Sequence, residues 1–301
     1  MIRDKITEQQ NLASTEIDRK STMEILEIIN MEDRKVADAV RKSLLEIEQF
    51  IEALVGQFNR GGRLFYIGSG TSGRLGILDA AECPPTFRTS SDMIQGIIAG
   101  GYDALTHSIE GSEDSTDEGK KAILDYNISE KDVALGITAS SSTPYVLGAL
   151  QQAKYNKALT GLIICNVAPD LKYIDHMISV IVGAEVITGS TRMKAGTATK
   201  MVLNMITTTA MIKLNKTFGN LMIDLKASNK KLLDRGARII KQITNLGYDD
   251  AIQLLQFADG EVKTAIVMNK LSINAKDARE KIVKHNGSLQ KILDNTEKMS
   301  F

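Results

Sequence analysis

The sequence predicts an α/β protein built on a doubly wound, five-stranded parallel sheet that is flanked by helices. The first observation is a series of short apolar runs, which read "RLFYIG", "MIQGIIAG", "VALGIT", "TGLIIC" and "MISVIVG". The second is helical spacing in most of the intervening segments, notably 73–82, 115–125 and 144–157. Strands that are apolar throughout and alternate with helices indicate a parallel sheet covered on both faces. Ligands of such sheets bind at the carboxyl ends of the strands.

The chain before the first strand is predicted to be helical. Apolar residues recur at three- and four-residue spacing from about residue 21 to residue 58, which fits two helices with a break near Asn30–Glu32. Ser21 and Glu24 have the spacing of a capping box at the start of the first helix. We assign residues 1–55 to an N-terminal helical segment and 56–220 to the sheet domain.

Helices also follow the last strand. A long helix is expected over roughly 191–214, and residues 221–246 form a helical connector. Residues 247–301 have the pattern of a small separate helical unit, with helices at Tyr248–Phe257 and Glu261–Asn269 and a third that starts after Asn274 and stops at Asn286–Gly287.

Composition limits the function classes. The 301 residues include 37 Lys+Arg and 37 Asp+Glu, so no overall field attracts nucleic acid or an anionic membrane, and we expect neither as a partner. Two cysteines and three scattered histidines give no disulfide framework and no metal site by spacing. The start "MIRDKITEQQ" lacks an apolar signal core and no apolar run has membrane-spanning length, so a cytoplasmic protein is expected.

The first strand leads into "GSGTSG", in which Gly68, Gly70 and Gly73 fit the pattern G-x-G-x-x-G. Such a loop before a helix favours an anion. A dinucleotide site also needs an acidic residue after the second strand, whereas Asp92 precedes "MIQGIIAG". The loop instead carries three hydroxyls, on Ser69, Thr71 and Ser72.

A second hydroxyl-rich loop, "TASSSTP", follows the third strand and carries Thr138, Ser140 and Thr143. One such loop is explained equally well by helix capping, because serine and threonine are common caps. Two of them at the carboxyl ends of parallel strands favour a phosphate monoester, rather than a nucleotide, as the ligand.

Two carboxylates are candidates for chemistry. Glu82 precedes "CPP", where two prolines should end the helix and stiffen the corner, although a surface glutamate is the simpler interpretation. Glu113 lies in "EGSEDST", ahead of a helix that Ser115 is expected to cap. From its residues alone this acidic run is solvated surface, and a hard-cation site is a weaker alternative. Cys83, with no histidine partner, is interpreted as a packing residue.

A third feature is "GAEVITGSTRMKAGTATK". Ser190 or Thr191 is expected to cap the long helix, which puts Arg192 and Lys194 in its first turn. Positive charge there opposes the helix dipole, and an anionic ligand would remove that cost. Arg192 is therefore a candidate ligand-binding residue.

These stretches together resemble the N-acetylmuramic acid 6-phosphate etherase family of the sugar isomerase (SIS) superfamily, over nearly the whole chain. The resemblance is carried by "GGRLFYIGSGTSGRLGILDAAECPPTF", "IIAGG", "EGSED" and "GAEVITGSTRMKAGTATKMVLNMI". It implies a flavodoxin-like SIS sheet, a C-terminal unit similar to a ubiquitin-associated domain, a homodimer and no cofactor. It also implies that Glu82 and Glu113 are the two functional glutamates and that Ser72, Thr138, Ser140 and Thr143 hold the sugar phosphate.

The chain departs from the family pattern in the second hydroxyl loop. Where the family usually has Gly followed by Arg or Lys, this sequence has Ser141 and Ser142. A basic side chain in this loop would contribute a charge-assisted hydrogen bond to an anion, and this loop lacks one. The family's G-P-E also reads Gly183-Ala184-Glu185.

The resemblance implies a carbon–oxygen lyase of cell-wall amino-sugar recycling, which splits the D-lactyl ether of N-acetylmuramic acid 6-phosphate into N-acetylglucosamine 6-phosphate and D-lactate. Removal of the C2 proton of the open-chain sugar allows lactate to leave, and water then adds. We assign Glu113 as the C2 base and Glu82 as the acid for lactate. The alternatives are an aldose–ketose phosphosugar isomerase and a non-catalytic sugar-phosphate-binding regulator.

Overall fold

The structure is a computed structural model that describes residues 5–297, with side chains described through residue 294. The chain divides into two compact units, each considered by itself. The sheet unit combines the chain up to Ala81 with Ser91–Thr207, and the helical unit combines Glu82–Ser90 with the chain from Thr208 onward. The finer predicted boundaries at residues 55, 220 and 246 stay predictions.

The sheet unit contains the predicted five-stranded parallel sheet. Its strands are β1 (Leu64–Gly68), β2 (Ile94–Ile98), β3 (Val133–Ile137), β4 (Leu159–Ile164) and β5 (His176–Ser179). The order is β2-β1-β3-β4-β5, and each neighbouring pair is parallel. This is the flavodoxin-like order, in which the direction of winding reverses between β1 and β3. The predicted fold class is confirmed.

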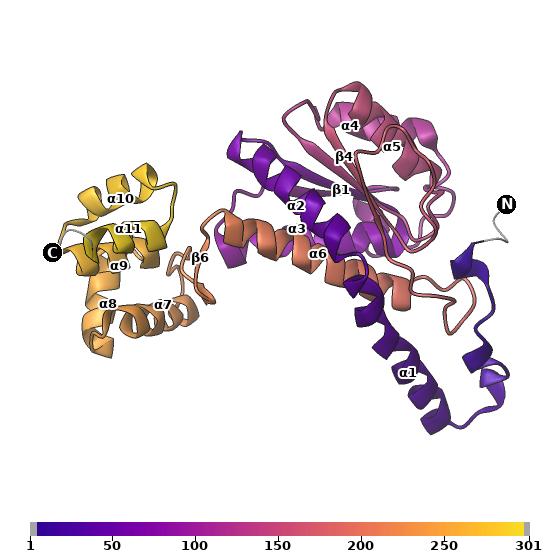
Figure 1. The fold of residues 1–301 in the computed structure, drawn as a ribbon, viewed down its shortest axis with the longest axis horizontal. Coiled ribbons are helices and arrows are strands. Elements are labelled where there is room, and N and C mark those ends of the chain that lie inside the picture. Colours follow the sequence, from indigo (N-terminus) through magenta and orange to yellow (C-terminus); the bar gives the residue numbers. More distant parts are fainter. Residues whose placement is uncertain (1–4, 298–301) are drawn as a thin grey trace. The chain divides into compact units, whose positions relative to one another are not determined.

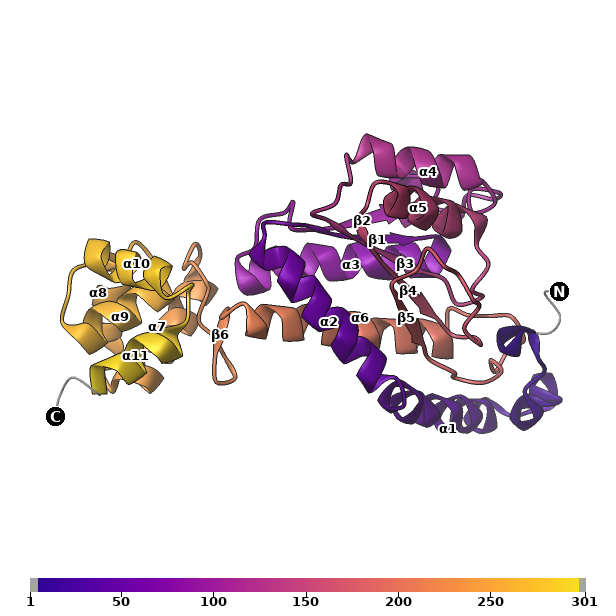
Figure 2. The same ribbon diagram turned by 45° about the horizontal axis from the view of Figure 1, so that its top comes forward.

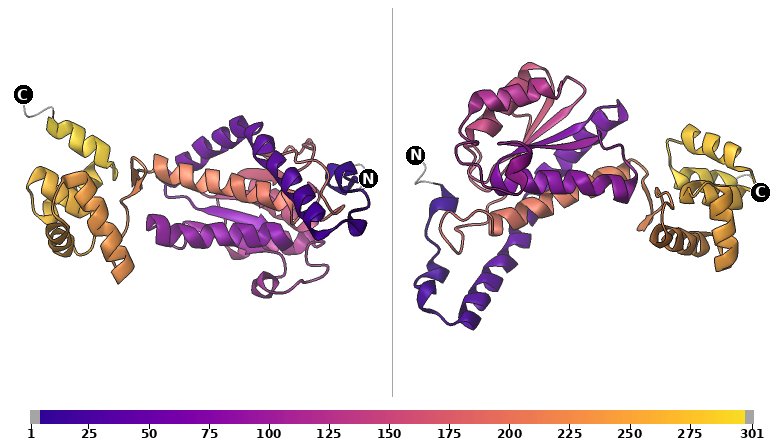
Figure 3. Two further views of the ribbon diagram at one scale, coloured as in Figure 1. Left: turned by 90° about the horizontal axis from the view of Figure 1, so that it is seen from below. Right: turned by 180° about the vertical axis from the view of Figure 1, so that it is seen from behind.

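Helices cover both faces of this sheet. Helices α4 (Thr116–Asp125) and α5 (Pro144–Tyr155) lie on one face, and α2 (Leu44–Asn59), α3 (Gly70–Phe87) and α6 (Lys194–Lys213) lie on the other (Figures 1 and 2). The view from behind shows the same layers with the sheet between them (Figure 3). The core between the sheet and α4/α5 is formed by fully buried apolar side chains such as Phe65, Ile123 and Leu150. Burial on both faces explains why the strands lack polar alternation.

The predicted N-terminal helices are present, but their break was misplaced. Helix α1 spans Thr22–Arg41, and the chain turns at Lys42–Ser43 before α2. The Ser21–Glu24 capping box is confirmed, since each residue's side chain bonds the other's backbone N–H. The chain stays helical through Asn30–Glu32, and the Glu32 side chain accepts hydrogen bonds from Asn11 and Lys194 in two other segments. Local sequence does not display these tertiary contacts.

Helix α3 also continues further than predicted. It runs through Pro84 and Pro85 to Phe87, instead of stopping at Glu82. Proline fixes φ near the helical value even though it removes a donor, so two prolines do not by themselves reverse the chain. The helix ends where Arg88 adopts a positive φ of 53°.

The helical unit has its own core. It contains a short hairpin, β6 (Thr217–Phe218) and β7 (Leu221–Met222), which sequence analysis missed. Its helices are α7 (Lys230–Thr244), α8 (Tyr248–Phe257), α9 (Val262–Leu271), α10 (Ala275–Lys284) and α11 (Leu289–Glu297).

Glu261 of this unit pairs with Arg88, the residue that follows α3. It accepts hydrogen bonds from Arg88 at 3.0 Å and from Arg279 at 2.9 Å. The predicted end of α10 at Asn286–Gly287 is confirmed, since both residues have positive φ. The likeness to a ubiquitin-associated domain stays a prediction.

Candidate active site

A polar cavity of about 480 Å³ lies at the carboxyl ends of β1 and β3, where the winding of the sheet reverses. This is the position at which open α/β sheets bind ligands. The two loops predicted to hold a phosphate form most of its wall. The lining includes Ser69, Thr71, Ser72, Glu113, Thr138, Ser140 and Thr143, together with Lys5, Glu8, Asp114 and Ser142.

The first loop connects β1 directly to α3, and two of its glycines are required by close packing. A Cβ on Gly68 would lie 2.6 Å from the backbone nitrogen of Gly73, and a Cβ on Gly73 would lie 2.6 Å from the Ile98 side chain. The glycine pattern therefore brings the start of α3 against the sheet. That approach places the Ser69, Thr71 and Ser72 side chains at the cavity wall.

Glu113 is brought to the same wall by contacts from both sides of the cavity. The Ser69 hydroxyl donates to Glu113 Oε2 at 2.9 Å, and the backbone carbonyl of Glu113 accepts from Tyr145 N in α5 at 3.0 Å. Arg74 of α3 anchors the preceding segment by donating to the carbonyls of Ala104 and His107 at 3.0 and 2.9 Å. The Glu113 carboxylate is thus exposed to the cavity while its backbone is fixed.

The second loop presents a connected group of hydroxyls at the start of α5. Thr138 is buried, and its hydroxyl lies 2.7 Å from that of Thr143 and 3.3 Å from that of Ser140. Helix α5 begins at Pro144, and the side chain of its N-cap residue, Thr143, makes no capping hydrogen bond. The simple capping interpretation of Thr143 is therefore wrong. These hydroxyls border the cavity at the positive end of a helix dipole.

The structure does not bring all the predicted residues to this cavity. Among the described residues that line it, neither Glu82 nor Arg192 is present. Glu82 is exposed and lies twelve residues after Gly70 in α3, about 18 Å along the helix axis. Arg192 is exposed in the turn before α6, whereas its neighbour Thr191 does line the cavity. The functional roles of Glu82 and Arg192 stay predictions.

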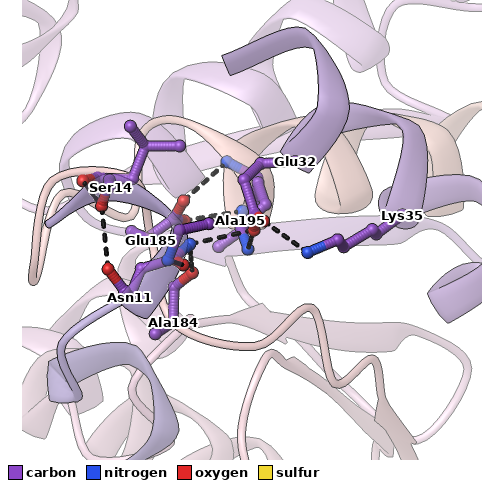
Figure 4. A network of polar contacts seen from close by, with 10 residues as sticks. Asn11, Ser14, Glu32, Lys35, Ala184, Glu185 and Ala195 are labelled. Atoms are coloured by element: carbon purple, nitrogen blue, oxygen red, sulfur yellow. Dashed lines mark hydrogen bonds and ion pairs between the residues drawn. The ribbon is translucent and has the colours of Figure 1, made fainter. Parts of the chain in front are cut away.

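The start of α6 differs from the prediction. Its first amides are capped by the carboxylate of Glu185, which accepts from Lys194 N at 3.0 Å and from Ala195 N at 2.9 Å, and not by Ser190 or Thr191 (Figure 4). Lys194 is buried and its Nζ lies 2.6 Å from Glu32 Oε2. The charge that Lys194 brings to this turn is therefore compensated inside the protein, without a ligand.

Glu32 is the centre of this buried network. Burial opposes its ionisation, but hydrogen bonds from Lys194, Lys35 and Asn11 outweigh that cost and lower its pKa to about 2. Asn11 also donates to the Ala184 carbonyl at 3.0 Å, so the network joins the N-terminal segment, α1 and the loop before α6 (Figure 4). Burial raises the pKa of Glu185, and the two backbone donors act against that shift.

Sequence reasoning missed two residues that shape the cavity. Lys5 lines it from the N-terminal segment, and Arg74 anchors the loop that carries Glu113. Arg74 had a detectable signal, since it is a charged residue directly after the glycine loop. Lys5 had none, because it lies 59 residues before β1 in a polar segment without periodicity.

Neither cysteine offers a nucleophile in the described chain. Cys83 and Cys165 are both buried and form no disulfide, which agrees with the packing role predicted for Cys83, and burial raises the pKa of Cys165 to about 12. Across residues 5–297, no group of three or more His, Cys, Asp and Glu side chains is arranged to hold a metal ion. No helix in that range is long and apolar enough to cross a membrane.

Comparison with known proteins decides the family. The model of the glucokinase regulatory protein N-terminal SIS domain matches residues 46–154. N-acetylmuramic acid 6-phosphate etherase 2 of Vibrio parahaemolyticus is 48% identical over 96% of this chain and 97% of its own length. The etherase of Rhodopirellula baltica is 47% identical over 95% of each chain. The chain belongs to the N-acetylmuramic acid 6-phosphate etherase family.

The family resemblance drawn from the sequence motifs is thereby confirmed. Among solved structures, phosphoheptose isomerase from Neisseria gonorrhoeae is similar over 63% of this chain and 98% of its own, at 15% identity and a TM-score of 0.46. The structure gives no reason for the serine at position 141, where the sequence departs from the family pattern. Ser141 adopts a positive φ of 63°, the region that favours the family's glycine.

Proposed function

We propose that this protein cleaves the D-lactyl ether of N-acetylmuramic acid 6-phosphate, giving N-acetylglucosamine 6-phosphate and D-lactate, as a carbon–oxygen lyase of cytoplasmic cell-wall recycling. The observation that carries the proposal is the cavity at the ends of β1 and β3. There the Glu113 carboxylate, 2.9 Å from the Ser69 hydroxyl, lines the same cavity as the hydroxyls of Thr138, Ser140 and Thr143. The names of the relatives supply the substrate.

The proposed reaction begins with the open-chain sugar, in which the ether at C3 lies beta to the C1 aldehyde. The Glu113 carboxylate takes the C2 proton, the C2–C3 double bond forms and the C3–O bond to lactate breaks. Glu82 donates its proton to the departing oxygen. Glu82 then takes a proton from water, whose oxygen adds to C3, and Glu113, after its carboxyl proton has exchanged with solvent, gives a proton to C2. Each proton transfer by a positioned group contributes typically 10²–10⁴-fold.

We further propose that Glu82 reaches the cavity from a second copy of the chain. Ser69, just before α3, contacts Glu113, whereas Glu82 lies about 18 Å further along that helix. The exposed apolar side chains of α1 and α2 support a homodimer, because Met23, Leu26, Met31 and Leu45 are each more than half exposed, at 65, 55, 55 and 62%.

Mixed dimers test this arrangement. Chains carrying Glu82→Gln and chains carrying Glu113→Gln are co-expressed, and each homodimer is assayed alone. If the glutamates act across the interface, a mixed dimer keeps one intact site of two. With random pairing about half of the dimers are mixed, so roughly a quarter of wild-type activity returns. Return of no activity would show that both glutamates act within one chain.

The reaction itself is tested by incubating the protein with N-acetylmuramic acid 6-phosphate in deuterated water. Release of D-lactate with deuterium at C2 of the sugar product is the expected result. Exchange at C2 without lactate would favour an isomerase-type site that lacks the leaving-group acid. Tight binding with neither signal would indicate a sugar-phosphate regulator.

A further inference from the structure

Lys5 occupies the cavity from a part of the chain distant from both hydroxyl loops. We propose that its ammonium group is the cation that holds the phosphate of the substrate, an assignment that rests on the proposed function. It assigns a binding role to a residue in the N-terminal segment, ahead of the first helix. The assignment is carried by three observations, namely the anchoring of this segment, the charge balance of the cavity and the contact of Lys5 with the second hydroxyl loop.

The segment that carries Lys5 is fixed to the end of the sheet. Ile6 N donates to Asn166 Oδ1 at 3.0 Å, and Asn166 follows β4. Thr7 is fully buried, with its hydroxyl 3.2 Å from Asn166 Nδ2 and its carbonyl 3.1 Å from Gly189 N. Gly189 belongs to the loop before α6, so the segment is held between two loops of the sheet unit. Lys5 therefore projects from an ordered anchor.

The second observation is the charge balance of the cavity, in which Lys5 stands among carboxylates. The described charged side chains that line the cavity are Lys5 and three carboxylates, Glu8, Glu113 and Asp114. A phosphate monoester carries close to two negative charges near neutral pH. Hydroxyls and the positive end of the α5 dipole favour an anion, but the three carboxylates repel it. Among the described residues that line the cavity, Lys5 carries the positive side chain, and its ammonium offsets part of this repulsion.

Lys5 lies at the hydroxyl loop itself. Its Nζ donates to the Ser142 hydroxyl, and Ser142 lies 3.3 Å from Ser140 in the connected hydroxyl group. Ser142 is also the position at which the family pattern leads one to expect a basic side chain. The structure thus places a cation from another segment where the loop lacks one of its own. Burial lowers the pKa of Lys5, while Glu8 acts in the opposite direction.

The test compares Lys5→Met, which keeps the length of the side chain, with Lys5→Arg, which keeps the charge. Lys121→Met is the matched control, because Lys121 is exposed on α4 outside the cavity. Affinities for N-acetylglucosamine 6-phosphate and for unphosphorylated N-acetylglucosamine are measured by calorimetry on the full-length protein. Lys5→Met is expected to weaken binding of the phosphorylated sugar by roughly 10- to 100-fold, the range for a charge-assisted hydrogen bond. Binding of the unphosphorylated sugar should change little.

Further readouts separate binding from folding. Lys5→Arg should keep most of the affinity, and Lys5→Met combined with Ser142→Arg should regain much of what Lys5→Met loses. In turnover, the KM of Lys5→Met should rise much more than kcat falls, because the phosphate is remote from the bond that breaks. Unchanged affinity in Lys5→Met, or an equal loss for both sugars, would overturn the assignment.

Failure of the two proposals is distinguishable. A wild-type protein that releases lactate while Lys5→Met binds the phosphorylated sugar normally would refute only the role of Lys5. A wild-type protein that binds the phosphorylated sugar through Lys5 but releases no lactate would refute only the proposed reaction.

Discussion

The N-termini of α5 and α6 follow similar stretches of small polar residues, yet they are used differently. At α6, the Glu185 carboxylate accepts hydrogen bonds from the backbone of Lys194 and Ala195, and Glu32 neutralises the Lys194 side chain. At α5, the Thr143 side chain makes no capping bond, and the neighbouring hydroxyls border a cavity. At α5 a backbone carbonyl, that of Glu113, accepts from Tyr145 N at 3.0 Å, and no side chain caps the helix. A helix start that an internal carboxylate caps is scaffold, whereas one that borders a polar cavity without a charged cap is available to a ligand.

The largest effect expected from this comparison is a loss of activity at the cavity beside the start of α5. Glu113→Gln should lower kcat for lactate release by about 10²–10⁴-fold, because the amide cannot take the C2 proton. Glutamine keeps the shape and can still accept from Ser69, so the thermal midpoint should stay close to wild type. The measurement is a coupled D-lactate assay alongside a melting curve, with Glu130→Gln as an exposed control outside the cavity. Full activity in Glu113→Gln would remove Glu113 from the reaction.

The corresponding change at the start of α6 should lower the free energy of unfolding and leave activity unchanged. Glu32→Gln removes the carboxylate that forms an ion pair with the buried Lys194 ammonium, a loss that costs about 3–5 kcal/mol in the free energy of unfolding. Urea denaturation measures it, and Glu27→Gln on the exposed side of α1 is the matched control. At low temperature the folded fraction should keep its kcat. Loss of kcat in fully folded Glu32→Gln would mean that the two helix starts are not functionally separate.

The same network predicts a pH dependence. The pKa of Glu32 is about 2 in the folded protein, below its ordinary value of 4.5. A depressed carboxyl pKa stabilises the fold above the unfolded-state value, and that contribution, about 3 kcal/mol, is lost as pH falls from about 4.5 towards 2. The stability difference between wild type and Glu32→Gln should therefore shrink between pH 5 and pH 3 in urea titrations. A difference that is constant across this range would assign the stabilisation to packing.

The smallest expected effect concerns the backbone of the second hydroxyl loop, which follows β3. Ser141 has a φ of 63°, and glycine relieves the cost of this left-handed conformation, up to about 1 kcal/mol. Ser141→Gly should raise the thermal midpoint slightly, with little change in KM. Ser115→Gly at the cap of α4, where φ is −89°, is the contrasting control and should destabilise or have no effect. A lower midpoint for Ser141→Gly would show that the serine side chain stabilises the loop.

The amino-acid sequence by itself determined the fold class and the two hydroxyl loops of the site. Apolar strand runs alternating with helices specify a parallel sheet, and the hydroxyls after β1 and β3 meet because the carboxyl ends of neighbouring parallel strands lie together. These are signals of local pattern and topology. The family motifs added Glu113, which composition alone assigns to a solvated acidic run.

Only the tertiary structure decided which charges are already neutralised and which remain for a ligand. In the sequence, Lys194 is a charge in the first turn of a helix that an anionic ligand would compensate, whereas in the structure Glu32, 162 positions away in sequence, compensates it. Lys5 had no signal at all until the anchored N-terminal segment brought it to Ser142. Electrostatic compensation depends on distances across the folded chain and on burial, and neither is contained in the spacing of residues along the sequence.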